Sequence, residues 1–163
     1  MRPILLAALA FCVKAADTPQ SPVDTFERMK ALAGEWEADL PGFGKMSDSI
    51  RLVSNGKAIE ETLGTPADNE VSLYTRDGNR IVVTHFCALT ADGHQVRLET
   101  GPLRGVRDGI VFAFRDAINR HSRAAPHMRE VIMTFTDGGH FSEKWTKTEN
   151  GKDTVFEMKF VRR

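Results

Sequence analysis

The sequence predicts an all-β fold of roughly ten antiparallel strands that close into an up-and-down barrel, preceded by one short helix. Apolar and polar residues alternate in ten successive segments, five Asx-Gly dipeptides lie between segments, and one helical stripe precedes them. Alternation with a period of two is typical of strands with one buried face, and Asx-Gly favours the tight turns of β-hairpins. A flat sheet of ten strands would expose two edges, so closure into a barrel is favoured.

Length and charge limit the class of protein. The chain has 163 residues, with 22 basic and 22 acidic side chains and 41% hydrophobic residues, which is typical of one soluble domain with its own core. Its formal charge of zero removes the electrostatic basis for a nucleic-acid partner. No internal repeat or low-complexity tract divides it, so residues 23–163 are expected to form a single barrel domain.

The first 15 residues have the pattern of a signal peptide. Arg2 supplies the positive start, residues 4–13 form an unbroken apolar run, and Val13 and Ala15 stand three and one residues before a cleavage site. The run is too short to span a bilayer, so no transmembrane span is expected. Cleavage would leave 163 minus 15, or 148, residues and a periplasmic or secreted protein. The alternative is a buried N-terminal helix.

The two cysteines have different expected roles. Residues 9–12 resemble a lipobox in which the bulky Phe11 replaces the usual small residue, so anchoring of a lipoprotein through Cys12 is a second, disfavoured alternative. Removal of the signal peptide would leave Cys87 as the one cysteine, and the mature monomer would have no internal disulfide. Cys87 is interpreted as a small buried hydrophobic residue; the alternatives are a group facing the ligand and a nucleophile.

One helix is expected after a polar linker at residues 16–22. Asp24 and Glu27 have the spacing of a capping box, and Gly34 is a natural stop, so the helix is predicted over 25–33. Its apolar stripe is formed by Phe26, Met29 and Leu32.

The strands follow in sequence order. They are predicted at 34–40, 48–54, 58–63, 70–76, 80–88, 94–100, 109–116, 129–136, 140–147 and 153–161. The hairpin turns are predicted at Asn55-Gly56, Asp77-Gly78, Asp92-Gly93, Asp137-Gly138 and Asn150-Gly151. The one long irregular connection, Ala117 to Pro126, is the expected lid or mouth of the barrel.

The segment from Leu32 to Trp36, a helix that leads into Gly34-Glu35-Trp36, resembles the opening of lipocalins and related calycin barrels. In those proteins the tryptophan closes one end of the barrel and packs against an arginine near the chain end, which implies this role for Arg162. The chain is also similar to an uncharacterised family of exported bacterial barrel proteins. That similarity is carried by residues 71–78, 84–87, 114–116, 119, 127–128 and 140–145. It implies a fold and export, and no activity.

With Trp36 pointing inward, the alternation predicts a mainly apolar interior. Its apolar positions are Leu40, Ile50, Leu52, Ile59, Leu63, Val71, Leu73, Val96, Leu98, Ile110, Phe112, Phe114, Val131, Met133, Phe135, Phe141, Trp145, Phe156, Met158 and Phe160. The polar exceptions are Glu61, Glu143 and His85. A buried carboxylate needs a partner, a solvated cavity or a proton. The alternatives are an outward Glu61 after a one-residue slip, a cross-strand pair for Glu143 and an ordinary hydrogen-bonded His85.

These residues predict non-covalent binding of a small, largely apolar molecule inside an exported barrel. The candidate ligand-binding residues are Glu61, His85, Cys87, Phe112, Phe114, Met133, Glu143 and Trp145. This function calls for a cavity of about 300 Å³ or more. The alternative is a filled barrel whose mouth or outer surface binds another protein of the cell envelope; the oligomeric state is left open.

No cofactor is predicted. A haem or metal site is a further alternative, because His85 and Cys87 share a strand face. Further ligands could come from elsewhere in the chain, from His121, His127 and His140. Their spacing matches no compact metal motif. A hydrolase or isomerase that uses Glu61 or Glu143 with His85 is the enzymatic alternative. The chain contains no nucleophile elbow, zinc-protease motif or nucleotide fingerprint, so no catalytic residue is assigned.

Overall fold

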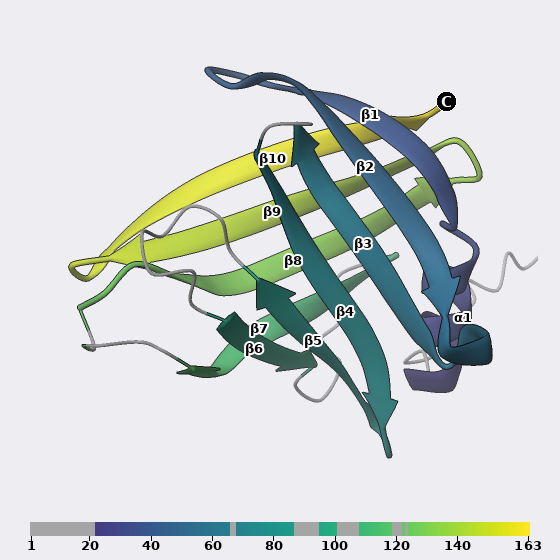
Figure 1. Ribbon diagram of the computed structural model, residues 1–163, viewed down its shortest axis with the longest axis horizontal. Coiled ribbons are helices and arrows are strands. Elements are labelled where there is room, and N and C mark those ends of the chain that lie inside the picture. Colours follow the sequence, from purple (N-terminus) through teal and green to yellow (C-terminus); the bar gives the residue numbers. More distant parts are fainter. Residues whose placement is uncertain (1–21, 66–67, 87–94, 101–107, 119–121, 123) are drawn as a thin grey trace, which may run out of the picture.

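The computed structural model describes residues 22–65, 68–86, 95–100, 108–118, 122 and 124–163 (Figure 1). It confirms the predicted fold class: strands pair antiparallel in the closed order β1-β10-β9-β8-β7-β6-β5-β4-β3-β2. The elements are α1 (Pro22–Lys30), β1 (Gly34–Leu40), β2 (Gly44–Val53), the 3-10 turn η1 (Ser54–Gly56), β3 (Ala58–Thr65), β4 (Asp68–Asp77), β5 (Arg80–Phe86), β6 (Gln95–Thr100), β7 (Gly109–Ile118), β8 (His127–Asp137), β9 (His140–Glu149) and β10 (Lys152–Arg162).

Several sequence predictions concern residues outside the described ranges. They are the signal peptide at 1–15, most of the linker at 16–22, Cys12, Cys87, the Asp92-Gly93 turn and His121. The predicted connection from Ala117 is partly wrong, because β7 continues to Ile118 before residues 119–121. Among the described residues, no helix combines the length and hydropathy needed to cross a membrane.

Helix α1 begins and ends about three residues earlier than predicted. Proline is well tolerated in the first helical turn, which places the start at Pro22. After Lys30, the Leu32 N–H donates to the Met29 carbonyl and the Ala33 N–H to the Lys30 carbonyl, and this tighter i→i+3 pattern ends the α-helix. Phe26, Met29 and Leu32 are buried, so the predicted apolar stripe is the face that covers one end of the barrel.

Trp36 and Arg162 stabilise the end of the barrel that α1 covers, which is its closed end. Trp36 is fully buried and its Nε1–H donates to the Leu32 carbonyl at 2.8 Å. The Arg162 guanidinium lies 4.1 Å from the centre of the indole ring. It also donates to the carbonyls of Ala33 at 3.0 Å and Gly138 at 2.9 Å, which joins α1, β1 and the β8–β9 turn. Gly34 has φ +149°, and a Cβ there would overlap the guanidinium.

Replacing Arg162 by alanine should lower the free energy of unfolding by about 2–4 kcal/mol, because it removes a cation–π contact and charge-assisted hydrogen bonds to carbonyls. Urea unfolding followed by circular dichroism measures this loss. The matched control is Arg163→Ala, which should cost less than about 1 kcal/mol, since it removes an exposed side-chain ion pair with Glu37 at 3.2 Å and keeps the backbone hydrogen bond to Glu35. Equal losses in the two variants would contradict a locking role for Arg162.

The four described Asx-Gly dipeptides all lie at hairpin connections, as predicted, but only Asn55-Gly56 and Asn150-Gly151 have positive φ at both residues. Asn150 and Gly151 both have positive φ, 51° and 73°, between β9 and β10. Asn55-Gly56 lies in η1, Asp77-Gly78 joins β4 to β5, and Asp137-Gly138 joins β8 to β9. Each connects strands that pair directly, so the order of strands around the barrel follows the order in the chain.

The interior is filled mainly by apolar side chains, but the inward face of β4 is the reverse of the prediction. Val71 and Leu73 lie on the outer face, whereas Ser72 and Tyr74 are buried. The physical reason is the pairing: Ser72 lies beside Glu61 and His85, whose buried polar groups need hydrogen-bonding neighbours. Leu52 is also not part of the core, because β2 ends next to η1 and leaves it 46% exposed.

The barrel closes through a short seam. Strand β1 pairs with β10 only at Trp36↔Arg162 and Glu37↔Val161, whereas β9 and β10 pair along ten positions. Beyond this seam β1 runs on to Leu40 and the β1–β2 turn, at the end of the barrel opposite α1 (Figure 1). The two strands therefore separate toward the open end.

Candidate ligand-binding site

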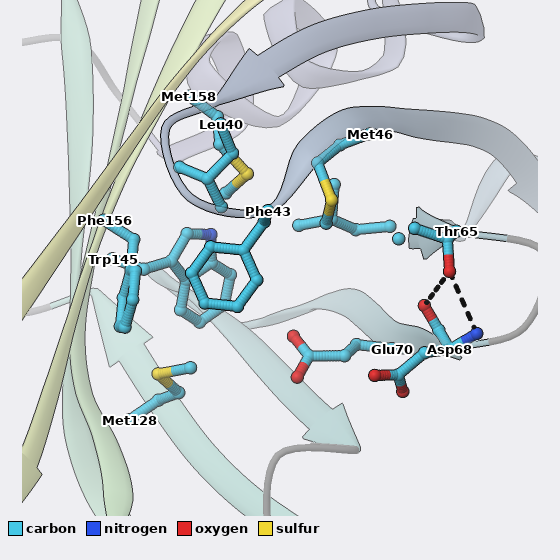
Figure 2. Close-up of a pocket in the computed structure, with 12 residues that line it drawn as sticks. Leu40, Phe43, Met46, Thr65, Asp68, Glu70, Met128, Trp145, Phe156 and Met158 are labelled. Atoms are coloured by element: carbon cyan, nitrogen blue, oxygen red, sulfur yellow. Dashed lines mark hydrogen bonds between the residues drawn. The ribbon is translucent and has the colours of Figure 1, made fainter.

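A cavity of about 130 Å³ lies at the end of the barrel opposite α1. It is lined by Leu40, Phe43, Met46, Leu63, Gly64, Thr65, Asp68, Glu70, Met128, Trp145, Phe156 and Met158 (Figure 2). We call this cavity the mouth pocket. Its walls come from β1, β2, β3, β4, β8, β9 and β10, so residues far apart in the sequence meet there because the barrel closes.

Aromatic rings and methionines supply most of the wall. The ring of Phe43, on the β1–β2 turn, lies edge-to-face with Phe156 at 6.0 Å and is 58% exposed. The turn holds Phe43 between two glycines with φ near +85°, Gly42 and Gly44, a conformation that other residues adopt poorly. Thioether side chains adapt to ligand shape and contact aromatic rings favourably, so this surface suits an apolar molecule.

The mouth pocket is smaller than the cavity expected from the sequence. Its volume of about 130 Å³ is below the range of about 300–1,000 Å³ that is usual for drug-sized ligands. Phe112, Leu98 and Ile81 are fully buried and occupy the middle of the barrel. The described structure therefore has room for a small molecule, or for one end of a longer one, and a large ligand enclosed in mid-barrel does not fit.

Two carboxyl groups from opposite walls meet below the mouth pocket. Glu61 on β3 accepts a hydrogen bond from the Tyr74 hydroxyl at 2.7 Å, and Glu143 on β9 accepts one from the Trp145 indole N–H at 2.8 Å. Both carboxyls are buried, and they lie close enough to share a hydrogen bond when one of them carries a proton. Trp145 thus lines the pocket and also holds a carboxyl beneath it.

His85 belongs to a second polar group on the neighbouring strands. In-register pairing places Glu61, Ser72 and His85 side by side on β3, β4 and β5. The Ser72 hydroxyl lies 3.1 Å from His85 Nδ1, and Glu70 Oε2 lies 3.5 Å from Nε2. The imidazole also packs at 4.7 Å from the Trp145 ring. Glu70 and Trp145 both line the mouth pocket, so His85 contacts two residues that a bound molecule would touch.

Asp48 is the third buried carboxyl and was missing from the sequence prediction. It is 0% exposed, and neither of its oxygens has a donor among the described residues. On β2 it pairs with Leu63, which in turn pairs with Glu70, so carboxyls lie on both sides of a residue that lines the pocket. Asp48 lies two residues before the inward Ile50, and residues two apart on a strand face the same side. This spacing was the signal that could have identified Asp48.

Burial sets the ionisation of these groups. Loss of solvent raises the pKa of Asp48 well above its ordinary value, and the nearby Glu61 raises it further. Burial, followed by the charges of Glu61 and Asp48, likewise raises the pKa of Glu143. Burial raises the pKa of Glu61, and the hydrogen bond from Tyr74 lowers it part of the way back. The three carboxyls therefore retain protons at a pH where exposed carboxyls have lost them.

The structure separates the predicted site residues into two groups. Glu61, His85, Glu143 and Trp145 lie together at the floor of the mouth pocket, as described above. The other described residues do not line it: Phe112 packs on Tyr74 at 5.6 Å, Met133 is buried beside Glu143 on the β8–β9 ladder, and Phe114 packs on His127 at 4.7 Å.

The residues that sequence reasoning missed are Asp48, Glu70, Ser72, Tyr74 and the β1–β2 turn. Glu70, Ser72 and Tyr74 were missed because the apolar Val71 and Leu73 predicted that the alternate positions of β4 face inward. No sequence pattern identifies Phe43, whose role depends on the folded turn.

The described histidines lie in separate places. His85 is inside the barrel, His127 begins β8, and the exposed His140 begins β9 beside Asp137 at 2.9 Å. Across the described ranges, no three histidine, cysteine, aspartate or glutamate side chains are grouped as metal ligands.

Comparisons with known proteins give no family. No protein-family description matches the sequence, and no curated protein matches it. Among solved structures, the chain is similar to a protein of unknown function from the DUF3598 family of Nostoc punctiforme, with a TM-score of 0.42 and 10% sequence identity. The alignment covers 83% of this chain and 48% of the other, so this chain spans about half the length of that protein.

Proposed function

We propose that this protein binds a small, largely apolar molecule non-covalently in the mouth pocket. The observation that carries the proposal is the pocket itself: an apolar cavity of about 130 Å³, walled by methionines and aromatic rings, above the polar floor formed by Glu61, Glu143 and Asp48. Apolar walls provide contact area and a few polar groups orient the ligand, which is the usual composition of small-molecule sites. The separation of β1 from β10 next to Leu40 and Phe156 supplies a route of entry.

Export forms part of this proposal. The signal-peptide pattern at 1–15 and the resemblance to calycin barrels and to exported bacterial barrels support a binding protein of the periplasm or of the medium. N-terminal sequencing of the protein recovered from its own host tests the cleavage after Ala15. Native mass spectrometry of the same sample would show which molecule, if any, accompanies the chain.

Titration with a neutral probe, 1-hexanol, should shift the methyl resonances of the pocket methionines in a saturable manner. Met46, Met128 and Met158 line the mouth pocket, whereas Met29 lies beneath α1 and Met133 lies in the packed core. The last two are internal controls in the same spectrum. Methyl-labelled methionine and two-dimensional NMR measure the effect.

The pattern of shifts is decisive. Movement of all five resonances together would indicate a general change in the barrel, and no saturable movement of Met46, Met128 or Met158 would contradict binding at this site. A second test is Met128→Trp, which fills the pocket from β8 and should weaken hexanol binding at least about tenfold.

The filled interior also supports the other function considered from the sequence, that of an interaction barrel. Phe43 is exposed at the mouth, and Val155 and Val161 on β10 are about half exposed near the seam. If hexanol fails to move the pocket methionines, cross-linking in the host envelope, with a photoreactive residue at position 43, would test this alternative.

A further inference from the structure

The charge around the mouth pocket has one sign. The charged side chains that line it are Asp68 and Glu70, both acidic. Beneath it lie Asp48, Glu61 and Glu143, and no lysine or arginine is buried in the described part of the chain. The described ionisable groups of the site are thus five carboxyls, His85 and Tyr74, and the two carboxylates that line the pocket favour a cation over an anion.

Four carboxyl oxygens beneath the pocket have no hydrogen-bond donor within the described ranges when all three buried carboxyls are ionised. Both oxygens of Asp48 and one each of Glu61 and Glu143 are fully buried with no donor among the described residues. A buried acceptor without a donor is costly, so these carboxyls either hold protons or are stabilised as anions by a positive charge in the pocket above them. An ammonium group supplies that charge, and it can donate hydrogen bonds to the Glu70 carboxyl, which lines the pocket.

Trp145 and Glu70 define where a cation would sit. The indole ring forms part of the pocket wall, its N–H donates to Glu143, and the His85 imidazole packs 4.7 Å from it. Figure 2 shows the Glu70 carboxylate directed toward Phe43 and Trp145, across the pocket from Leu40 and Met158. Aromatic faces and carboxylates together are the usual environment for bound ammonium groups.

We propose that the mouth pocket selects small amines, with the ammonium group beside Trp145 and Glu70, above the buried Asp48, and the hydrocarbon part among the methionines. This inference rests on the proposed function and adds the class of ligand. A bound ammonium keeps a neighbouring carboxyl ionised, so any proton held by that carboxyl is released to solvent on binding.

The test compares three probes of equal chain length: hexylamine, 1-hexanol and hexanoate. Each is titrated into the protein at neutral pH and fixed ionic strength, and the resonances of Met46, Met128 and Met158 report occupancy of the pocket. We expect hexylamine to bind at least roughly tenfold more tightly than hexanol, and hexanoate to bind most weakly.

Two substitutions test the source of this preference. Asp48→Asn and Glu70→Gln each keep the shape of the side chain and remove an acidic group, so each should reduce the preference for hexylamine over hexanol at least about threefold. The matched control is Glu157→Gln, which removes an exposed carboxylate on β10 and should leave the preference intact. Asp48→Asn replaces a buried carboxyl by a neutral group of the same shape, so the fold should tolerate it.

The outcomes separate this inference from the proposed function. Equal binding of hexylamine and hexanol, or tighter binding of hexanoate, would overturn amine selectivity and leave the pocket as a binding site. If no probe moves the pocket methionines, both the site and its selectivity are wrong. A preference that persists in Asp48→Asn and Glu70→Gln, or that disappears equally in Glu157→Gln, would also overturn it, since it would arise from the general surface charge.

Discussion

Raising the pH from about 5 to about 8 should lower the free energy of unfolding by about 1–3 kcal/mol. The cause is the buried group formed by Asp48, Glu61 and Glu143, whose pKa values are all raised in the folded protein, first by burial. Chemical unfolding at a series of pH values and constant ionic strength measures the change.

The sign follows from proton binding. In the unfolded chain these carboxyls have pKa values of about 4, so over the range above that value the folded protein holds protons that the unfolded chain has released. The stabilisation is complete below the unfolded pKa and is lost as the pH rises through the folded pKa values. Asp137 acts in the opposite direction, because the Gly139 N–H and then His140 lower its pKa, but its effect falls below this pH window.

The variant Glu143→Gln should reduce this pH dependence and raise stability near pH 8 by about 1–3 kcal/mol, since it removes one buried charge and can still accept the Trp145 hydrogen bond. It also supplies an amide donor to the neighbouring Glu61. The control is Glu157→Gln, which lies on the exposed face of β10 and should leave the pH profile unchanged. Stability that is flat or rises across this range in the wild-type protein would show that the three carboxyls are solvated.

The architecture was predictable because it depends on local signals. Alternation located all ten strands, and turns such as Asn150-Gly151 showed which strands are neighbours, because Asx-Gly with positive φ joins strands over the shortest distance. The end residues were less predictable. Helix α1 ends at Lys30 because i→i+3 hydrogen bonds replace the α-helical pattern. This change accompanies the tertiary hydrogen bond from Trp36 to the Leu32 carbonyl, which helix propensity does not describe.

The polar interior was only partly predictable, for a reason visible in β4. An apolar residue at Val71 or Leu73 normally marks the inner face, but here the inner positions are Ser72 and Tyr74, which serve the neighbouring polar groups. Glu61, Glu143 and His85 were found because they interrupt apolar faces. The short β1–β10 seam and the pocket volume arise from closure of the whole barrel, which no single segment encodes.

Replacing Trp36 by alanine should cost about 3–5 kcal/mol of unfolding free energy, the largest loss expected from a single change in this protein. The side chain is fully buried, packs edge-to-face on Phe141 at 4.8 Å and carries the Arg162 guanidinium on its ring. Trp36→Phe keeps an aromatic ring but loses the hydrogen bond to Leu32, so it should lose less and stay folded. A loss below about 1 kcal/mol in Trp36→Ala would contradict its role in closing the barrel.

The second tryptophan provides the comparison that separates stability from binding. Trp145 lines the mouth pocket at the other end of the barrel and donates to Glu143. Trp145→Phe should cost only about 1–2 kcal/mol of stability, since an aromatic ring remains, but it should weaken amine binding severalfold because the indole face and the hold on Glu143 are lost. Trp36→Phe should leave binding unchanged when both variants are folded and titrated with hexylamine. Similar binding losses in the two variants would mean that the ends of the barrel are coupled, and that the mouth pocket does not bind ligands independently of the closed end.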